Sequence, residues 1–307
     1  MAMDTQTLPP TTAHRIGVDL GGTKTEVVVL APLGDVAWRR RCPTPVDKGY
    51  TAILENIADL VRQAETRIPK GERTAVGIGI PGSIRPDTGS VQNANTTCLI
   101  GRPLQQDLET LLGRRVVVDN DANCFTLAES LAGAGRGYDL VFGVIMGTGC
   151  GGGLFINGRV RQGPHAIAGE WGHVVADPAG APCYCGNRGC VETLISGGGV
   201  ARRFCEETGR PLAMPAIVNG ARCGDPDCRR AFDRFLDDFG RCLGGLISVL
   251  DPDAVVLGGG LSHIDELYGA GTENVRHYAF GKNLRTPILK NRLGDSAGVI
   301  GAAWIGC

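Results

Sequence analysis

The fold of this chain is indicated by a segment near its start, Arg15-Ile16-Gly17-Val18-Asp19-Leu20, then Gly21-Gly22-Thr23-Lys24, then Thr25-Glu26-Val27-Val28-Val29-Leu30. Two runs rich in β-branched residues flank a glycine turn, which predicts a β-hairpin. The pattern returns in the second half, with a buried strand over 140–146, a glycine turn over 147–153 and a returning strand over 154–156. Two halves that each open in this way predict a duplicated α/β fold with a cleft between two domains.

Hydrophobic spacing predicts the other regular elements. Helices are expected over 50–64, over 122–131, over a stretch whose apolar stripe runs from Phe232 to Leu250, and over 297–305. Proline cannot continue a helix, so the long helix should end at Asp251-Pro252. Further strands are expected over 75–80, 115–118 and 254–257. We expect a disordered tail over 1–14, a small N-terminal domain over 15–122 with 293–307, and a larger C-terminal domain over 123–292.

Composition excludes several classes of protein. Of 307 residues, 47 are glycine, about twice the usual share, but no G-X-Y period suggests collagen. A hydrophobic content of 43% excludes a flexible linker, and a net charge of -1 gives no electrostatic reason to expect nucleic acid or an anionic membrane as partner. The first residues contain no secretory signal, so we expect a soluble, cytoplasmic protein whose thiols are reduced.

Several glycine turns directly follow buried strands, where backbone N–H groups can approach a phosphate that a Cβ would obstruct. Each turn, taken alone, is equally consistent with an ordinary hairpin. Gly147, Gly149 and Gly152 match the dinucleotide pattern G-x-G-x-x-G, as do Gly77, Gly79 and Gly82, but no helix is expected after either set. A phosphate-binding function would therefore use glycine hairpins.

A cysteine cluster offers a metal site. Cys183, Cys185 and Cys190 lie within one glycine-containing loop, and His173 precedes them by ten residues. Cys₃His is an accepted ligand set for structural zinc, and the alternative is a group of loop thiols without metal. Cys223 and Cys228 form a competing pair that we interpret as incidental.

Carboxylates supply the candidates for proton transfer. Asp119 and Asp121 lie where a strand meets a helix, and Asp121 could be either a general base or the N-cap of that helix. Glu170 and Glu192 could instead be the acid and base of a glycosidase, but that hypothesis explains neither the glycine turns nor the cysteines.

Together, Gly169-Glu170-Trp171-Gly172-His173, the three clustered cysteines with Glu192, and Asn120-Asp121-Ala122-Asn123 resemble the ROK family of sugar kinases. The resemblance runs from Ile16 to Trp304 and extends to the wider superfamily of actin-like ATPases, which have a ribonuclease H-like fold. It implies ATP and Mg²⁺ as cofactors, structural Zn²⁺, and a homodimer.

The resemblance also implies the site residues. Asp121 would be the general base, and Asp19 would hold Mg²⁺ through water. The sugar would be bound by Asn95, Asn120, Glu170, His173 and Glu192. Zinc would be bound by His173, Cys183, Cys185 and Cys190. The nucleotide loops would comprise Gly21, Gly22, Thr23 and Lys24, then Gly147, Thr148 and Gly149, and finally Gly258, Gly259 and Gly260, with Thr148 reaching the phosphates.

The implied reaction is transfer of phosphate from ATP to a hexose hydroxyl. Trp171 and the segment Pro182-Cys183-Tyr184-Cys185-Gly186 resemble bacterial fructokinases that also accept mannose. The N-acetylglucosamine kinases tend to have glycine at the position of Tyr184 and phenylalanine at that of Trp171, and glucokinases are a third choice. A non-catalytic sugar sensor is an alternative class. The family's repressors carry a helix-turn-helix domain ahead of Asp19, for which the fifteen or so residues there are too few.

Overall fold

The computed structural model describes residues 13–72, 74–281 and 283–306. The chain divides into two compact units. The first unit runs to Gly137 and also includes Gly153–Ala168 and the segment from Leu293 onward, and the second comprises Tyr138–Gly152 and Gly169–Arg292. The expected tail over 1–14 falls outside the described residues except for its end, where His14 Nδ1 lies 3.1 Å from Glu72 Oε2.

The first unit is built on a five-stranded sheet of order β3-β2-β1-β4-β7. Its strands are β1 (Arg15–Leu20), β2 (Lys24–Leu30), β3 (Val36–Pro43), β4 (Val76–Ile80) and β7 (Val116–Asn120). The predicted hairpin is confirmed, since β1 pairs antiparallel with β2 from Arg15↔Leu30 to Leu20↔Thr25. β4 and β7 then continue parallel to β1. A two-stranded sheet of β5 (Ser83–Ile84) and β6 (Val91–Gln92) follows β4.

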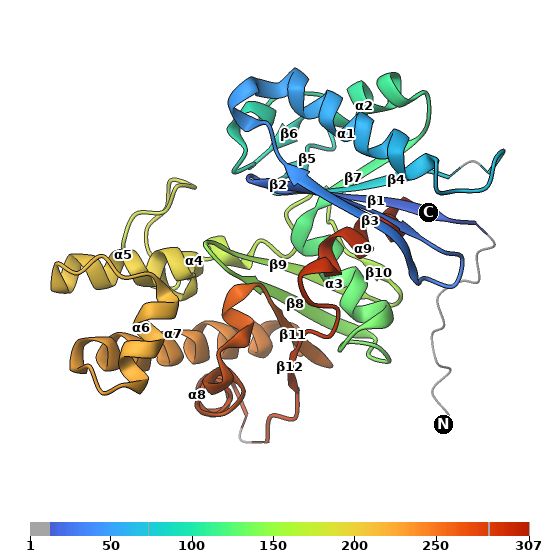
Figure 1. Cartoon of the computed structure of the whole chain (residues 1–307). Helices are drawn as coiled ribbons and strands as arrows, with labels where there is room; N and C mark the ends of the chain where they lie inside the picture. Colours follow the sequence, from blue (N-terminus) through green and yellow to red (C-terminus); the bar gives the residue numbers. More distant parts are fainter. Residues whose placement is uncertain (1–12, 73, 282, 307) are drawn as a thin grey trace, which may run out of the picture. The chain divides into compact units, whose positions relative to one another are not determined.

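Helices cover both faces of this sheet (Figure 1). α1 (Gly49–Glu65) and α2 (Leu104–Leu112) lie on one face, and α3 (Asp121–Ala132) and α9 (Ala297–Ile305) lie on the other. A Cβ on Gly17 or Gly77 would overlap the backbone of α9, so glycine at these paired strand positions lets the helix approach the sheet. Part of the glycine excess therefore serves packing.

The second sheet repeats the topology of the first, with order β10-β9-β8-β11-β12. Its strands are β8 (Leu140–Met146), β9 (Cys150–Ile156), β10 (Arg159–Val160), β11 (Ala254–Gly258) and β12 (Ile288–Lys290). In each sheet, three strands that are consecutive in the chain pair as neighbours. Two later strands then extend the sheet on the side of the first strand and run parallel to it. The predicted duplication is confirmed at the level of strand order.

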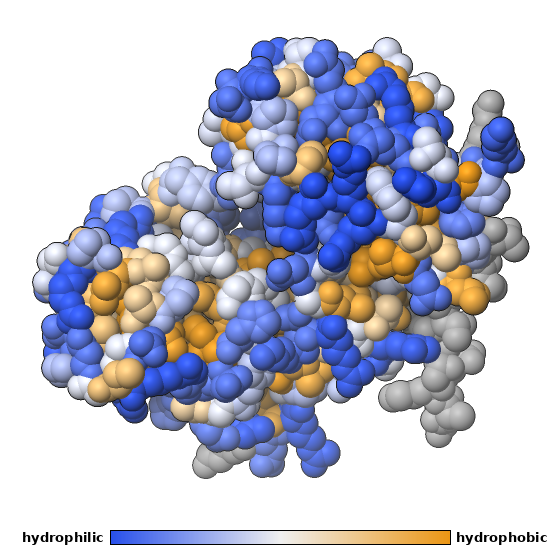
Figure 2. Space-filling view, in the orientation of Figure 1, coloured by the Kyte–Doolittle hydropathy of each residue, from blue (hydrophilic) through white to orange (hydrophobic). Residues whose placement is uncertain are grey.

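Five helices accompany the second sheet: α4 (Val191–Ile195), α5 (Gly197–Thr208), α6 (Met214–Arg222), α7 (Pro226–Leu250) and α8 (Ala270–Tyr278). The side chain of Asp225 caps α7 by accepting the N–H groups of Asp227 and Cys228, each at 3.0 Å. The helix ends as predicted, because Asp251 adopts a left-handed φ of 45° before Pro252. Within the described residues no helix is long and apolar enough to cross a membrane. Figure 2 shows a mainly hydrophilic surface with small separate hydrophobic patches.

Two boundaries differ from the sequence predictions. The glycine turn expected over 147–153 ends at Gly149, because β9 begins at Cys150 and takes up the following glycines. Residues 123–137 and Gly153–Ala168 were expected in the larger domain but belong to the first unit, where α3 packs against α9 and β4. A sequence motif at 120–123 marks the start of α3 and carries no information about the surface on which that helix packs.

Candidate active site

The parallel strands of the first unit end together. Their register aligns Asp19 of β1 with Gly79 of β4, and Gly79 with Asp119 of β7. Ligands of open α/β sheets bind beyond the carboxyl ends of such strands. This edge carries Asp19 and its glycine turn, together with Asn120 and Asp121.

Asp19 is a carboxylate in an unfavourable place for a charge. Burial raises its pKa to about 6, the negative charge of Glu26 adds to the effect, and Lys24 and Arg41 oppose it. Asp19 and Glu26 are directly paired across β1 and β2, and like charges so placed repel. A bound cation would compensate this accumulation of negative charge.

Sequence reasoning did not single out Glu26. Its side chain is 2% exposed and is held by the Arg41 guanidinium, whose Nε donates to Glu26 Oε2 at 2.9 Å. Arg39 Nε lies 3.4 Å from the other oxygen of the same carboxylate. The signal available in the sequence was a charged residue directly before the apolar run Val27-Val28-Val29-Leu30.

The turn after β1 is braced by its own backbone and by Thr44. Gly21 N–H donates to Lys24 O at 2.9 Å, and the Thr44 hydroxyl donates to Gly21 O at 2.7 Å. Gly22 is exposed, and a Cβ placed on it would meet nothing closer than 3.8 Å. The backbone at Gly22 is therefore open to a ligand, as the predicted phosphate loop requires.

Asn120 takes the capping role that the sequence left open for Asp121. Asn120 is the N-cap of α3, because its Oδ1 accepts the N–H of Ala122 at 2.8 Å and that of Asn123 at 3.4 Å. Its Nδ2 donates to Gly82 O at 3.1 Å, which leaves one amide hydrogen for a ligand. Asp121 is the first residue of the helix, so it need not serve as the cap. Its carboxylate lies in the first turn, where the helix dipole favours negative charge.

Asn95 is brought to the same edge by the turn that follows β4. Its N–H donates to Pro81 O at 3.1 Å, directly beside Gly82, which receives the Asn120 amide. Asn95 itself is exposed, and within the described part of the chain its side chain makes no hydrogen bond. Its amide is thus available for a sugar hydroxyl.

Asp119 has a structural role that the sequence did not reveal. Its carboxylate accepts hydrogen bonds from the Asn123 amide, the Gln162 amide and the Asn120 N–H, at 2.8, 2.8 and 2.7 Å. Burial nevertheless raises its pKa above the usual range. Asp119 therefore fixes the start of α3, and Gln162 supports it from a segment that is distant in sequence.

In the second unit, the two other glycine turns lie side by side at the carboxyl edge of the parallel pair β8 and β11. The register pairs Ile145 with Gly258, so the turn over 147–149 neighbours the turn over 258–260. Gly259 has a φ of +75°, and a Cβ there would overlap the backbone of Met146. Glycine is required at this position on both grounds.

The start of α5 secures the turn over 147–149. Gly197 N–H donates to Gly147 O at 2.8 Å and Gly198 N–H donates to Thr148 O at 3.1 Å. The first N–H groups of α5 are thus used on this turn. The Thr148 side chain lines a cavity of about 260 Å³ together with Tyr184, Glu192 and Arg202.

Glu170 and Glu192 are half-buried near one another. Glu192 Oε2 accepts the Cys150 N–H at 2.9 Å. Within the described residues Glu170 has no side-chain hydrogen bond, and burial raises its pKa, with His173 opposing and Glu192 adding to the rise. A buried carboxylate without a donor is suited to accept hydroxyl groups of a ligand.

The four predicted metal ligands converge. Within the described chain, the donor atoms of His173, Cys183, Cys185 and Cys190 all lie within 4.8 Å of one another. His173 Nδ1 lies 3.5 Å from Cys183 Sγ, and Cys185 Sγ lies 3.6 Å from Cys190 Sγ. Cys228 by contrast packs against Gly220 at the junction of α6 and α7.

His173 presents its other nitrogen to Tyr184. Nε2 lies 3.0 Å from the Tyr184 hydroxyl, and the two rings meet edge to face at 5.1 Å. Tyr184 was noted in the sequence only as a family marker. Its hydroxyl lies at the imidazole nitrogen that faces away from the cysteines.

The strand order, the carboxyl-edge glycine turns and the Cys₃His loop define a sugar kinase of the actin-like ATPase fold. Residues 15–306 match the model of the ROK family, and the chain belongs to that family. It is 39% identical over 299 residues to an N-acetyl-D-glucosamine kinase of Yersinia pseudotuberculosis, covering 94% of this chain and 97% of that one.

Two solved structures are similar along nearly their whole length. A ROK hexokinase from Thermus thermophilus has a TM-score of 0.86 and 32% identity, with 95% of this chain and 97% of that chain covered. A ROK glucokinase from Streptomyces griseus, in complex with glucose and AMPPNP, has a TM-score of 0.79 and 31% identity, with coverages of 95% and 99%.

Proposed function

We propose that this chain transfers the terminal phosphate of ATP to a hydroxyl of N-acetylglucosamine. The observation that carries the kinase assignment is the alignment of Asp19, the glycine turn after it and Asp121 at one carboxyl edge of the first sheet. The 39% identical relative supports the acetylated sugar over the fructose that the sequence favoured.

The chemistry divides among the chain's own residues. Asp121 accepts the proton of the attacking hydroxyl, while Asn95, Asn120, Glu170, His173 and Glu192 orient the sugar. Thr148 and the open backbone of the glycine turns hold the phosphates of ATP. Asp19 would hold Mg²⁺, and the ion would supply neutralisation of the charge that develops on the transferred phosphate.

The Cys₃His cluster fits zinc. Tetrahedral zinc with Zn–S bonds of about 2.3 Å and Zn–N bonds of about 2.0–2.1 Å places two sulfurs about 3.8 Å apart and a sulfur and a nitrogen about 3.6 Å apart. The observed distances are 3.6 Å between Cys185 Sγ and Cys190 Sγ and 3.5 Å between Cys183 Sγ and His173 Nδ1. His173 would bind zinc through Nδ1, which leaves Nε2 for the sugar. Zinc would thereby fix the orientation of a sugar-binding imidazole.

Trp171 gives no support to fructose. It is 5% exposed, meets Phe142 edge to face at 5.9 Å, and its Nε1 donates to Gly151 O at 3.4 Å. An exchange of tryptophan for phenylalanine at this position changes core packing. Of the markers that favoured fructokinase, Tyr184 brings its side chain into contact with a predicted sugar ligand, since its hydroxyl lies 3.0 Å from His173 Nε2.

The test is kcat/KM with ATP and Mg²⁺ for N-acetylglucosamine, fructose, mannose and glucose. We expect the highest value with N-acetylglucosamine. A higher value with fructose would restore the alternative, and sugar binding by calorimetry without turnover of any sugar would indicate a sensor. Gel filtration would test the predicted homodimer.

A further inference from the structure

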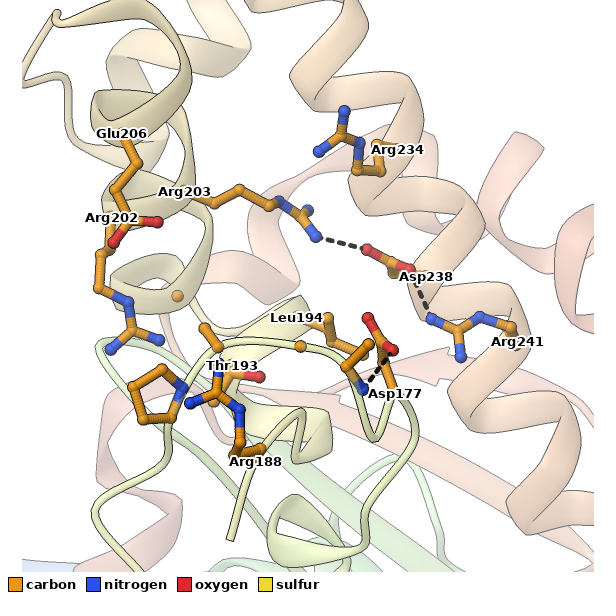
Figure 3. A pocket seen from close by; sticks show the side chains of 15 residues that line it. Asp177, Arg188, Thr193, Leu194, Arg202, Arg203, Glu206, Arg234, Asp238 and Arg241 are labelled. Carbon is orange, nitrogen blue, oxygen red and sulfur yellow. Dashed lines mark hydrogen bonds and ion pairs between the residues drawn. The ribbon is translucent and has the colours of Figure 1, made fainter.

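A second cavity in the second unit is lined by an unusual number of arginines (Figure 3). Its volume is about 460 Å³, and it lies between the loop that contains Asp177 and Arg188, helix α5 and helix α7. The arginines that line it are Arg188, Arg202, Arg203, Arg234 and Arg241. We call it the arginine pocket. None of its residues belongs to the set assigned above to ATP, sugar or zinc.

The positive charge of the arginine pocket is only partly compensated. Asp238, 6% exposed, receives both Arg203 at 2.9 Å and Arg241 at 2.8 Å, so one carboxylate holds two guanidinium groups. The other acidic residues of the lining are Asp177 and Glu206, and Arg234 pairs with Glu207 beside the pocket, so five positive charges meet four negative ones.

Two of the arginines are unpaired. Arg188 and Arg202 are exposed to the cavity from the loop and from α5, and neither makes an ion pair within the described chain. Arg203 Nη2 is also buried without an acceptor among the described residues. Unused guanidinium donors that line a concave site favour an anionic ligand, and their planar fork matches phosphate oxygens.

We propose that the arginine pocket binds a phosphate monoester of a small molecule, with a sugar phosphate as the class of ligand. Two unpaired guanidinium groups match the charge of a phosphate dianion. The volume falls in the range of small-molecule sites and leaves room for a sugar ring beside the phosphate. Thr193 and Leu194, which are 6% and 5% exposed, also line the pocket.

The arginine pocket adjoins the smaller cavity that contains Thr148 and Glu192. Both cavities share Pro182, Thr193, Gly199 and Arg202 in their linings. A sugar phosphate in the arginine pocket would therefore contact the segment that carries the zinc loop and α4. The proposal does not depend on which sugar the kinase prefers, since it concerns a separate site.

Isothermal titration of the full-length, zinc-loaded protein tests this. Mg²⁺, AMPPNP and unphosphorylated sugar are kept saturating, and the titrant is N-acetylglucosamine 6-phosphate or fructose 6-phosphate. Because a hydrogen bond to a charged group contributes roughly one to two orders of magnitude in affinity, we expect Arg188→Ala to raise Kd about tenfold or more. Arg188→Ala combined with Arg202→Ala should raise it further, while Arg40→Ala, which removes an exposed arginine of the first unit, should leave it unchanged.

Three results would overturn the proposal. One is the absence of any binding once the catalytic ligands are saturating, and another is a Kd that the arginine variants do not change. The third is equal affinity for sulfate, which would identify a general anion site. Thermal melts and zinc content check folding, and Arg202→Ala, on a helix outside the zinc loop, carries the test if Arg188→Ala does not fold. Since binding is measured without turnover, failure here is distinct from failure of the proposed kinase activity.

Discussion

Replacing Asp19 by asparagine should stabilise the protein at neutral pH while removing its activity. The carboxyl of Asp19 has an ordinary pKa of 3.8 that burial, with Glu26, raises to about 6 in the folded chain. At about 1.4 kcal/mol for each pH unit, ionising this group costs the folded state about 3 kcal/mol at neutral pH. Asparagine has nearly the same shape and avoids that cost.

The sign of the pH dependence follows from proton binding. Between about pH 4 and pH 6 the folded chain holds more protons at Asp19 than the unfolded chain does, so the stability due to this group falls as pH rises. The cost is about 1 kcal/mol at about pH 4.5 and about 3 kcal/mol at about pH 7.5. The advantage of Asp19→Asn should therefore grow with pH.

Differential scanning calorimetry without Mg²⁺ or nucleotide measures this difference. For domains of this size we expect a gain in Tm of roughly 6–12 °C at about pH 7.5 and roughly 2–4 °C at about pH 4.5. Asp35→Asn, which changes an exposed aspartate in the same unit, should alter Tm little at either pH. An advantage of Asp19→Asn that does not change with pH, or a loss of stability at neutral pH, would refute the reasoning.

The remaining predictions concern the chemistry of the site. Asp121→Asn should lower kcat by on the order of 10²–10⁴-fold, since general-base catalysis is lost, with normal Tm and zinc content; near-normal turnover would remove Asp121 as the base. Cys190→Ser should lower the zinc-to-protein ratio measured by mass spectrometry after dialysis, because a thiolate ligand is lost, whereas a wild-type ratio near zero would exclude the metal. Tyr184→Gly should change the ratio of kcat/KM between N-acetylglucosamine and fructose by roughly 10–200-fold, because it uncovers His173 Nε2 and enlarges the adjoining space. Tyr184→Phe is its control for ring packing, and equal ratios in all three proteins would show that this side chain does not select the sugar.

Local pattern was enough to predict most of the fold. The hairpin of β1 and β2 follows from β-branched runs around glycines, and the end of α7 follows from Pro252. Both signals act within a few residues. The packing of α3 in the first unit could not be found in this way, because its partner α9 comes from the end of the chain and approaches the sheet through Gly17 and Gly77.

In the candidate site too, contacts between residues close in sequence were predicted and contacts between distant segments were not. The ligands of the Cys₃His cluster are close in sequence, so their spacing predicted a cluster that the fold brings together. Asp119 and Glu26 were not predicted as structural carboxylates because their partners, Gln162 and Arg41, are supplied by other elements. Asn120 illustrates a further limit of sequence-based prediction. The sequence did not reveal that its one side chain both caps α3 and keeps a single N–H donor for a ligand.

The sugar preference shows why a family marker needs a position in space before it can be used. Trp171 was used as a marker of the fructokinases in the sequence, but its ring packs against Phe142, so it reports how the core of the second unit is filled. Tyr184 was used as a marker too, and its hydroxyl lies 3.0 Å from His173 Nε2. With Tyr184 in place, a sugar must either break the contact between Tyr184 and His173 or bind beside the tyrosine. Discrimination between an acetylated and a plain hexose is therefore expected to depend on this contact. A Trp171→Phe variant should lower Tm and leave the ratio of kcat/KM between the two sugars nearly unchanged.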